Sequence, residues 1–500
     1  MIKSVAKPPT WNRMRLAFTS SLLLLFGTVP AHAQISSFKH VIVIFQENRT
    51  PDNLFQGLCR PPFGTSGSCS TTPDATQYNI QTSNWLDKHS PTGVTQPLPI
   101  PLGNAYDLGH SHDAFNNQCD ARPSGPCRMD GASDVSCVGT CPSQPQFRFV
   151  ENPNAGTHGI LDPYLTLATQ YGWANYMFQT NQGPSFPAHQ FIFGGTSAPT
   201  AGDDHMGIFA SENMRGVVHA NWRAGCIAGA TTRVELVNPN PNPPPRGVEN
   251  SEVYPCFDHQ TIPDILPAGV SWRYYTPSAG SIWTAPNAIS HICQSTGPGG
   301  TCQGQEWLNH VDLRPSDVLA DIRNCNLRSV SWVIPAGQNS DHAGNPDNTG
   351  GPAWVAAIVN AIGNNPTCPN GEVYWHNTAI FITWDDWGGW YDHEPPTILP
   401  LPQGDYQYGF RVPLIVVSAY TPAGYISNFR YDFGSILRFI EHNFGIPEGQ
   451  LNFADRRATR GLRSFFHLDQ APRPFQRVSA AKDASYFLND KTVPTDPDDD

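Results

Sequence analysis

The sequence has little charge and few long hydrophobic stretches. Asp, Glu, Lys and Arg make up 14% of its 500 residues, and no segment after residue 33 has eighteen uninterrupted apolar residues. A membrane-spanning helix needs about 20 predominantly apolar residues, so we expect no integral membrane span beyond residue 33. No heptads, internal repeats or low-complexity linkers divide the chain. The sequence therefore predicts one exported, globular body.

Basic residues are the scarcer charge. The chain has 30 Lys and Arg against 42 Asp and Glu, and residues 1–33 hold four of the basic residues and no acidic one. The part beyond residue 33 thus carries 26 basic and 42 acidic residues. An acidic surface argues against nucleic acid as a partner and offers no polybasic membrane anchor. It still allows a phosphate substrate, because a bound metal reverses the local field.

The first 33 residues have the pattern of a secretory signal peptide. Four basic residues precede the apolar stretch 16–29, and Ala31-His32-Ala33 provides a small-x-small cleavage site. Arg13 and Arg15 are not adjacent, so the twin-arginine pair is lacking and general secretion is expected. We expect cleavage after Ala33 and a secreted or periplasmic protein.

Twelve cysteines follow this segment, and an even number in an exported chain indicates disulfides. The alternative is a zinc site at Cys137 and Cys141, but it lacks a second close pair with histidines. Pairing of sequence neighbours is plausible, although spacing alone leaves the connectivity open. We expect structural disulfides and few or no free thiols. The cysteines are at positions 59, 69, 119, 127, 137, 141, 226, 256, 293, 302, 325 and 368.

Apolar β-type runs alternate with helical patterns along a chain rich in proline (48) and glycine (43). This alternation predicts an α/β fold with a mostly parallel central sheet and helices on both faces. Loop-rich, disulfide-stapled insertions account for the proline and glycine. We expect a catalytic domain at 34–470 and a C-terminal tail at 471–500. The expected strands are His40–Phe45, Val330–Ile334, Thr378–Thr383 and Val412–Ser418, and the expected helices are Leu161–Tyr171, Ala353–Ile362 and Phe433–Phe444.

Two of these strands end in hard oxygen ligands. The first runs into Glu47 and Asn48, and the strand near residue 380 stops on Asp385 and Asp386, followed by two glycines. Open α/β sheets build their sites at the carboxyl ends of strands. The pattern predicts one divalent-metal site assembled from distant segments. The plainer alternative is that the acids only mark strand ends and turns.

Ser185 lies between two prolines, directly before an apolar segment. Such a serine is common in turns, but an adjacent metal would make it a candidate nucleophile. His110, His291, His342 and His393 each stand beside acids or small polar residues. A histidine in that setting is either a tuned acid, a cation for phosphate oxygens or a hydrogen-bonded surface residue.

Four aromatic residues, Trp384, Trp387, Trp390 and Tyr391, surround the second acidic pair. They either provide an apolar approach to a site or pack in the core, which is the default for Trp384.

Six short segments occur in an order that resembles the bacterial phosphoesterase family containing phospholipases C and a branch of acid phosphatases. The resemblance spans residue 38 to about residue 445. It implies an alkaline-phosphatase-like α/β fold. The segments are Glu47-Asn48-Arg49, Gly183-Pro184-Ser185, Ser340-Asp341-His342, Asp385-Asp386-Trp-Gly-Gly-Trp-Tyr-Asp392-His393, Gly409-Phe-Arg-Val-Pro413 and Tyr431–Glu441.

The resemblance also implies roles for individual residues. Ser185 is the implied nucleophile and passes through a phosphoserine intermediate. His110, His342 and His291 are implied to contact phosphoryl oxygens or to protonate the leaving group, with His291 the least anchored. His393 is implied to support the site from behind. The implied ligands of one divalent cation, of unspecified identity, are Glu47, Asn48, Asp385 and Asp386.

Ser185 and the Asp385-Asp386 pair match the acid-phosphatase branch better than the phospholipase branch, which usually has threonine and Asp-Glu at these positions. The substrate is therefore a phosphate ester, with monoesters, diesters and phospholipids all open. The rival interpretation is a non-catalytic extracellular binding protein that uses the acids for structural calcium. Calcium sites usually draw several ligands from one loop, whereas these acids come from distant strands, which favours an enzyme. The oligomeric state is left open.

Overall fold

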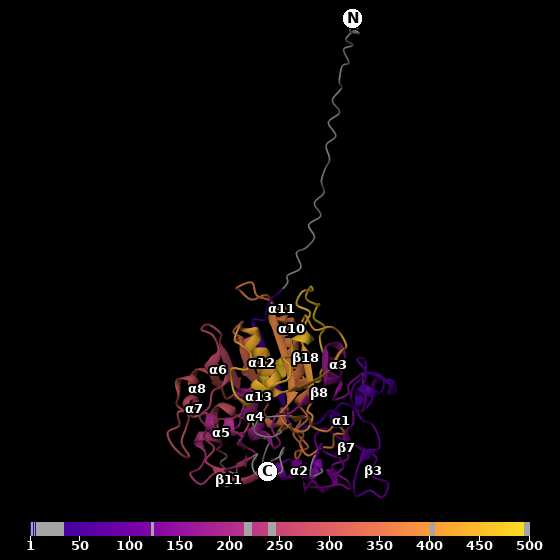
Figure 1. The fold of residues 1–500 in the computed structure, drawn as a ribbon, viewed down its shortest axis with the longest axis vertical. Coiled ribbons are helices and arrows are strands. Elements are labelled where there is room, and N and C mark those ends of the chain that lie inside the picture. The colour runs from indigo at the N-terminus through magenta and orange to yellow at the C-terminus, as the bar shows by residue number, and fades with distance from the viewer. Residues whose placement is uncertain are drawn as a thin grey trace.

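The structure is a computed structural model that describes residues 1, 4, 6, 35–121, 125–214, 223–238, 247–400 and 406–494. The predicted signal peptide at 1–33 lies almost entirely outside these residues. A central sheet flanked by helices occupies the middle of the folded body (Figure 1).

Eight strands form this sheet, and the sheet is mostly parallel, as predicted. In chain order the strands are β1 (His40–Gln46), β8 (Gly172–Phe178), β12 (Trp272–Tyr275), β13 (Val311–Asp312), β14 (Val330–Val333), β15 (Thr378–Trp384), β18 (Leu414–Val417) and β19 (Tyr425–Asp432). Their order across the sheet is β13-β12-β14-β1-β15-β18-β8-β19. All neighbouring pairs are parallel except those of β18, which is antiparallel to β15 and to β8.

Helices and short strand pairs surround the sheet. The helices are α1 (Pro51–Leu54), α2 (His112–Cys119), α3 (Asp162–Gln170), α4 (Ser185–Gly194), α5 (Ala201–Met206), α6 (Ile262–Ile265), α7 (Ser290–Cys293), α8 (Gln305–His310), α9 (Asp317–Arg323), α10 (Gly351–Asn364), α11 (Tyr374–Asn377), α12 (Phe433–Asn443), α13 (Phe453–Arg457) and α14 (Ala484–Asn489). The short strands are β2 (Trp85–Leu86) with β3 (Val94–Thr95), β4 (Leu98–Ile100) with β7 (Arg148–Val150), β5 (Tyr106–Leu108) with β6 (Cys137–Gly139), β10 (Val234–Asn238) between β9 (Phe209–Ala210) and β11 (Val248–Val253), and β16 (Ile398–Leu399) with β17 (Tyr406–Gln407).

The two strands predicted to carry the site lie next to each other. β1 pairs in parallel with β15, and their register sets Gln46 opposite Trp384. Every residue of both strands is buried, which explains their unbroken apolar sequences. The residues that follow the two strands therefore leave the sheet at the same edge.

Helices cover both faces of the sheet. Phe381 of β15 packs against Phe439 of α12 with ring centroids 4.9 Å apart, whereas Trp384 packs against Tyr164 of α3 at 5.1 Å. Successive strand residues point to opposite faces, so residues three apart face opposite sides. α12 therefore lies on one face together with α4, and α3 lies on the other together with α10. The predicted helical cover on both faces is confirmed.

Six disulfides join the twelve cysteines and leave no free thiol. Each disulfide links two consecutive cysteines of the sequence. Cys137 and Cys141 form a disulfide with each other, which rules out the alternative of a zinc site at these two residues. The pairs are 59–69, 119–127, 137–141, 226–256, 293–302 and 325–368.

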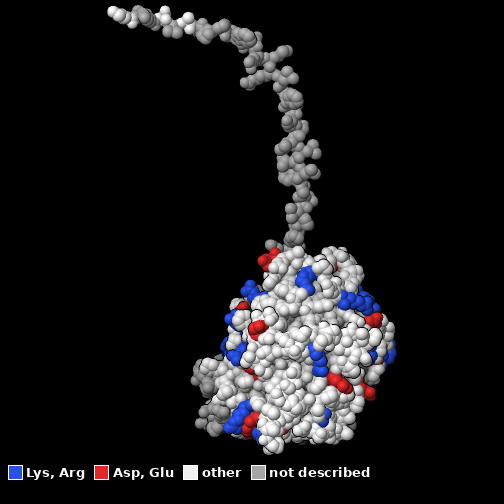
Figure 2. Space-filling view, turned by 90° about the vertical axis from the view of Figure 1, so that its right-hand side faces the viewer, with Lys and Arg blue, Asp and Glu red and all other residues white. Residues whose placement is uncertain are grey.

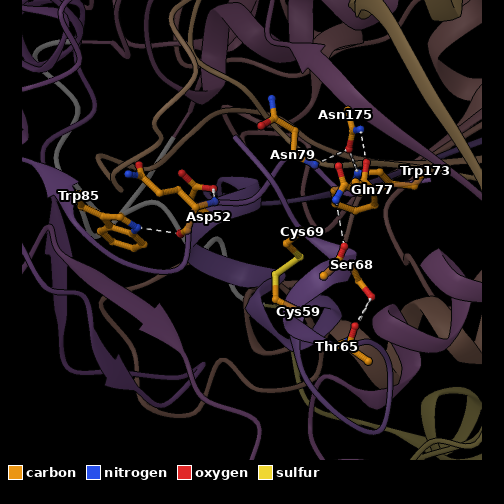
Figure 3. The surroundings of a disulfide bond; sticks show 12 residues. Asp52, Cys59, Thr65, Ser68, Cys69, Gln77, Asn79, Trp85, Trp173 and Asn175 are labelled. Carbon is orange, nitrogen blue, oxygen red and sulfur yellow. Dashed lines mark hydrogen bonds between the residues drawn. A yellow bond between two sulfur atoms is a disulfide. The ribbon is translucent and has the colours of Figure 1, made fainter. Parts of the chain in front are cut away.

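The Cys59–Cys69 disulfide staples an insertion that Asn175 of β8 fastens to the sheet (Figure 3). The Asn175 amide donates from Nδ2 to the carbonyl oxygen of Gln77 at 2.8 Å and accepts at Oδ1 from the backbone N–H of Asn79 at 2.7 Å. One sheet residue thus satisfies two backbone groups of a loop that has no strand partner at these positions. This is how a loop-rich insertion is held in place.

The segment from residue 471, which the sequence separates as a tail, packs against α10. Asn360 exchanges two hydrogen bonds with the backbone of Val478, at 2.8 and 2.9 Å. Phe487 of α14 is buried against Trp354, with ring centroids 5.1 Å apart. Residues 471–494 therefore belong to the folded body.

Figure 2 shows one face of the molecule, on which basic and acidic side chains are interspersed among a majority of neutral residues. That face has no continuous patch of either sign. Within the described ranges, no helix combines the length and the apolar character needed to cross a membrane.

Candidate active site at the carboxyl ends of β1 and β15

The structure brings together the two acidic strand ends. The backbone N–H of Asn48 donates to Asp385 Oδ1 at 3.1 Å, and the N–H of Arg49 donates to the carbonyl oxygen of Asp386 at 3.1 Å. Glu47, Asn48, Asp385 and Asp386 are all fully buried. Residues 337 positions apart in the sequence therefore form one cluster at the edge of the sheet.

Gly388 allows the two strand ends to approach so closely. Its φ of +61° is in the left-handed region, and a Cβ at this position would lie 2.6 Å from both Cβ and the carbonyl oxygen of Asn48. Its N–H donates to Asp386 Oδ1 at 2.7 Å. Glycine is required here both for the left-handed turn and for the close contact with Asn48. The same turn orients the side chain of Asp386.

Ser185 is the first residue of α4 and lies beside Asp386. Its Oγ donates to Asp386 Oδ2 at 3.2 Å, and the side chain is fully buried. Pro184 precedes the helix, and the next N–H, that of Phe186, donates to Asn213 Oδ1 at 3.0 Å. The amino end of a helix favours negative charge. The hydroxyl thus has a proton acceptor at hand and lies where an anion is stabilised.

His189, a residue without a predicted role, completes the cluster. It is four residues after Ser185 on α4 and therefore on the same helical face. Its Nε2 lies 3.5 Å from Glu47 Oε1 and 3.8 Å from Asp385 Oδ2. Burial lowers the pKa of His189 to about 4, against the opposing effect of Asp385. The four-residue spacing between Ser185 and His189 could have indicated a shared site from the sequence, but only with the knowledge that a helix begins at Ser185.

The donor atoms of this cluster fit a divalent cation. Ligand atoms of Glu47, His189 and Asp385 all lie within 4.8 Å of one another. Among the described residues, Asn48 Oδ1, Asp385 Oδ2 and His189 Nε2 are buried without a hydrogen bond. Burying carboxylates and lone pairs together is costly unless a cation compensates them. Two of the expected ligands, Glu47 and Asp385, therefore offer oxygen atoms that lie close enough together to share one ion with His189.

His110, which lies beside Asn48, and His342, which lies beside His110, each direct Nδ1 at a backbone carbonyl oxygen. His110 Nδ1 lies 2.8 Å from the carbonyl oxygen of Leu108, and His342 Nδ1 lies 2.7 Å from that of Ala343. A carbonyl accepts only, so both Nδ1 atoms carry hydrogen. The lone pair of each neutral ring is then on Nε2, which in His110 lies 3.3 Å from Asn48 Nδ2. The two rings are 6.1 Å apart between centroids, and both are suited to proton transfer.

Asp341 anchors the loop that carries His342. Its Oδ2 accepts from the Tyr164 hydroxyl and from Trp384 Nε1, both at 3.0 Å. Complete burial raises the pKa of Asp341 to about 6, although Arg49 acts in the opposite direction. The residue before His342 therefore ties its loop to the sheet rather than to a ligand.

His291 does not join the cluster. It lies on α7 at the surface, where Nδ1 is 3.1 Å from Asp258 Oδ1 and Nε2 is 3.2 Å from Asp264 Oδ2. The hydrogen bond to Asp264 raises the pKa of His291. These contacts form a surface ion pair, and within the described part of the chain no hydrogen bond or ion pair links His291 to Ser185 or to the strand ends.

His393 belongs to a second buried group behind the site. Its Nδ1 lies 2.7 Å from Asp52 Oδ2. Arg411 donates from Nε and Nη2 to the two oxygens of Asp392, at 2.8 and 2.9 Å, and also lies 3.6 Å from Asp52. Burial alone lowers the pKa of Arg411, but Asp392 and Asp52 raise it above its ordinary value. This network connects the turn after β15, which carries Asp392 and His393, to Asp52 of α1 and to Arg411, which precedes β18.

The aromatic residues around Asp385 pack in the core. Trp384, Trp387, Trp390 and Tyr391 have no exposed surface. Trp387, for example, packs against Phe410 with ring centroids 5.3 Å apart. They do not line an apolar approach to the site.

Comparison with known proteins relates the whole of this region to one family. The sequence model of the phosphoesterase family matches residues 38–447. The chain is 24% identical over 491 residues to phospholipase C B of Mycobacterium tuberculosis (strain CDC 1551 / Oshkosh), an alignment that covers 90% of this chain and 81% of that protein. It is 33% identical over 233 residues to non-hemolytic phospholipase C of Burkholderia pseudomallei (strain K96243), covering 38% of this chain and 32% of that protein. Among solved structures, a protein in the alkaline phosphatase superfamily from Vibrio parahaemolyticus aligns with 10% identity and a TM-score of 0.29 over 57% of this chain and 60% of that one.

Proposed function

This chain belongs to the phosphoesterase family and is a phosphoric ester hydrolase, and from that premise we propose that Ser185 is its nucleophile. The observation that carries the proposal is the 3.2 Å hydrogen bond from Ser185 Oγ to Asp386 Oδ2 at the amino end of α4. A serine hydroxyl is a weak nucleophile until a neighbouring base or a metal activates it. Asp386 and the cluster beside it meet that need.

In the first step, Ser185 Oγ forms a bond to phosphorus while its proton passes to Asp386 Oδ2. The bond from phosphorus to the leaving oxygen breaks, and that oxygen takes its electron pair and a proton from the imidazolium form of His110 or His342. In the second step water attacks the phosphoserine and gives its proton to the same histidine. Ser185 leaves with the proton held by Asp386, which restores the starting state.

Glu47, Asn48, Asp385 and Asp386 would hold one divalent cation beside Ser185. When bound, such a cation stabilises negative charge that develops on oxygen and lowers the cost of ionising a nearby hydroxyl. The residues of the chain do the positioning, because the Gly388 turn fixes Asp386. The amino end of α4 adds a further positive potential where the phosphoryl oxygens lie.

The substrate class that we propose is a phosphate ester, either a monoester or a phospholipid. The relatives named phospholipase C favour a phospholipid, whereas the serine and paired aspartates favour an acid-phosphatase-like monoester. Ser185 is fully buried, so a substrate reaches it only when neighbouring side chains move apart. A panel of p-nitrophenyl phosphate, bis-p-nitrophenyl phosphate and phosphatidylcholine separates the three ester types. The N-terminal sequence and six disulfides support action outside the cytoplasm.

Ser185→Ala tests the nucleophile. We expect a loss of about 10³-fold or more in kcat, because the covalent route is removed. The matched control is Ser331→Ala, since Ser331 Oγ is buried on β14 and makes no hydrogen bond among the described residues. Rapid acid quenching of wild type during turnover should trap phosphate on the peptide containing Ser185. A folded Ser185→Ala protein that retains a tenth of the wild-type rate would show that another group attacks phosphorus.

A further inference from the structure

The donor set of the cluster contains a nitrogen that the strand ends do not provide. The four residues at the ends of β1 and β15 offer only oxygen. His189 reaches the same position from α4, with Nε2 3.5 Å from Glu47 Oε1 and 3.8 Å from Asp385 Oδ2. Two donors each about 2.1 Å from one ion lie roughly 3–4 Å apart. The measured separations match that requirement without any movement of the helix.

Tyr274 fixes the tautomer that a metal ligand needs. The Tyr274 hydroxyl donates its hydrogen to the carbonyl oxygen of Trp283 at 2.7 Å. The Tyr274 oxygen also lies 3.4 Å from His189 Nδ1. Because the hydroxyl hydrogen is donated to Trp283, the Tyr274 oxygen can only accept a hydrogen bond from His189. Nδ1 therefore carries the hydrogen of the neutral ring. The Nε2 lone pair then faces the carboxylates of Glu47 and Asp385.

The packing of the ring leaves it little freedom to turn away. His189 is fully buried, between the ring of Phe45 at 4.8 Å and the indole of Trp283 at 6.1 Å, measured between centroids. Among the described residues, Nε2 has no hydrogen bond. A buried imidazole that is held in place, with its lone pair directed at two carboxylates, is the arrangement of a metal-ligating histidine whose other nitrogen is anchored.

On the basis of the proposed function, we propose that His189 is a nitrogen ligand of the catalytic cation and that Tyr274 is its positioning residue. The site then has a mixed nitrogen and oxygen donor set. Imidazole suits Zn²⁺ and similar transition-metal ions, whereas Mg²⁺ and Ca²⁺ take oxygen ligands. The ligand class that this site selects is accordingly a borderline divalent ion of the first transition row, held next to Ser185 by a residue of the same helix.

Metal binding by the whole protein tests this inference without reference to turnover. The metal-free protein and its His189→Gln and Tyr274→Phe variants are titrated with Zn²⁺ and, separately, with Ca²⁺ in competition with a chelator. We expect His189→Gln to weaken Zn²⁺ binding at least about 10-fold and Tyr274→Phe to weaken it about 10-fold, with a change of less than about 3-fold for Ca²⁺ in both. His259→Gln is the matched control. His259 is also buried, with Nδ1 3.1 Å from the backbone carbonyl oxygen of Gln260, and among the described residues it forms no hydrogen bond or ion pair with Glu47 or Asp385.

X-ray absorption of the Zn²⁺-loaded wild type gives a second measurement that needs no variant to fold. An imidazole in the first coordination shell is expected. A shell of oxygen only, or a His189→Gln variant with wild-type Zn²⁺ affinity, overturns the inference. If instead the imidazole shell is present and Ser185→Ala remains active, the proposed nucleophile fails while the nitrogen ligand stands.

Discussion

Replacing Arg411 with methionine should destabilise the protein strongly, although Arg411 touches none of the residues proposed to act on substrate. The guanidinium is fully buried and makes two hydrogen bonds to Asp392, at 2.8 and 2.9 Å. It also donates to the backbone carbonyl oxygens of Asn79 and Asn175, each at 2.9 Å. Methionine fills much of the volume but provides no donor and no charge. The change therefore leaves Asp392 without its counter-charge and removes one of the two partners of Asp52, which keeps His393.

The expected loss follows from this uncompensated burial. Removing one partner of a buried ion pair costs about 3–5 kcal/mol, and each buried carbonyl left without a donor adds about 1 kcal/mol or more. We expect the free energy of unfolding to fall by at least about 4 kcal/mol, a large part of the roughly 5–15 kcal/mol typical of a folded protein. Adding Asp392→Asn should restore part of it, because the lone charge is then removed.

The loss should also depend on pH in a defined direction. Burial already raises the folded-state pKa of Asp392 to about 6, although Arg411 acts in the opposite direction. Removing the guanidinium therefore raises this pKa further above its unfolded value of about 3.9. The folded variant then holds a proton that the unfolded chain has released, so its stability falls as the pH rises above about 4. The fall amounts to at most about 1.4 kcal/mol per pH unit until the folded pKa is passed. The variant should therefore be closer to wild type at pH 5 than at pH 8.

Urea unfolding monitored by tryptophan fluorescence, under non-reducing conditions at pH 5 and pH 8, measures both effects. Arg430→Met is the matched control, because Arg430 is 55% exposed and lies 3.9 Å from Glu394, a pairing that contributes about 1 kcal/mol or less. If Arg411→Met loses no more stability than Arg430→Met, or is less stable at pH 5 than at pH 8 relative to wild type, the reasoning from buried charge is refuted.

Two further predictions concern the turn beside the site and the disulfides. Gly388→Ala should lower kcat at least about 10-fold and reduce metal content, because the new Cβ displaces Asn48 and adds about 1–2 kcal/mol of left-handed strain. Gly371→Ala is the control, because Gly371 has φ +84° and nothing lies within 4 Å of the added Cβ. This control has the backbone strain without the clash and should keep full activity. Replacing both cysteines of the 325–368 pair with serine should lower the free energy of unfolding in urea by about 4 kcal/mol, against about 2 kcal/mol for the 137–141 pair. The difference is expected because the first disulfide joins residues 43 positions apart and the second joins residues only 4 positions apart. Equal losses would contradict the loop-closure argument.

The parts of the fold that the sequence predicts are those where local pattern and final environment agree. The unbroken apolar runs of β1 and β15 are what strands covered on both faces require, so their acidic ends were expected to mark a site. β12 and β19 were not predicted, because their sequences Trp272–Tyr275 and Tyr425–Asp432 carry polar residues that only pairing with a neighbouring strand places in a sheet.

The site residues that were predicted are likewise those that follow a recognisable local pattern. Glu47, Asn48, Asp385 and Asp386 follow recognisable strands, and Ser185 follows a recognisable turn. His189 was missed because Pro184 and Pro187 hide the start of α4, although proline is tolerated in the first turn of a helix. Once the helix is known, the four-residue step from Ser185 places His189 on the same face. His291 has no such anchor, since its acidic partners are Asp258 and Asp264 rather than residues of the two strand ends.

The division of the site between β1 and β15 has a consequence for when the enzyme becomes active. Half of the cluster is synthesised early, as Glu47 and Asn48, and the other half only when residue 386 has been made. β1 cannot complete its pairing before then, because both of its neighbours, β14 and β15, come from residue 330 onward. The consecutive cysteine pairs, in contrast, close short loops as soon as each segment is available. Single segments of the chain can therefore be cross-linked independently of one another while no working site exists, so hydrolytic activity cannot begin before residue 386 of 500 has been made.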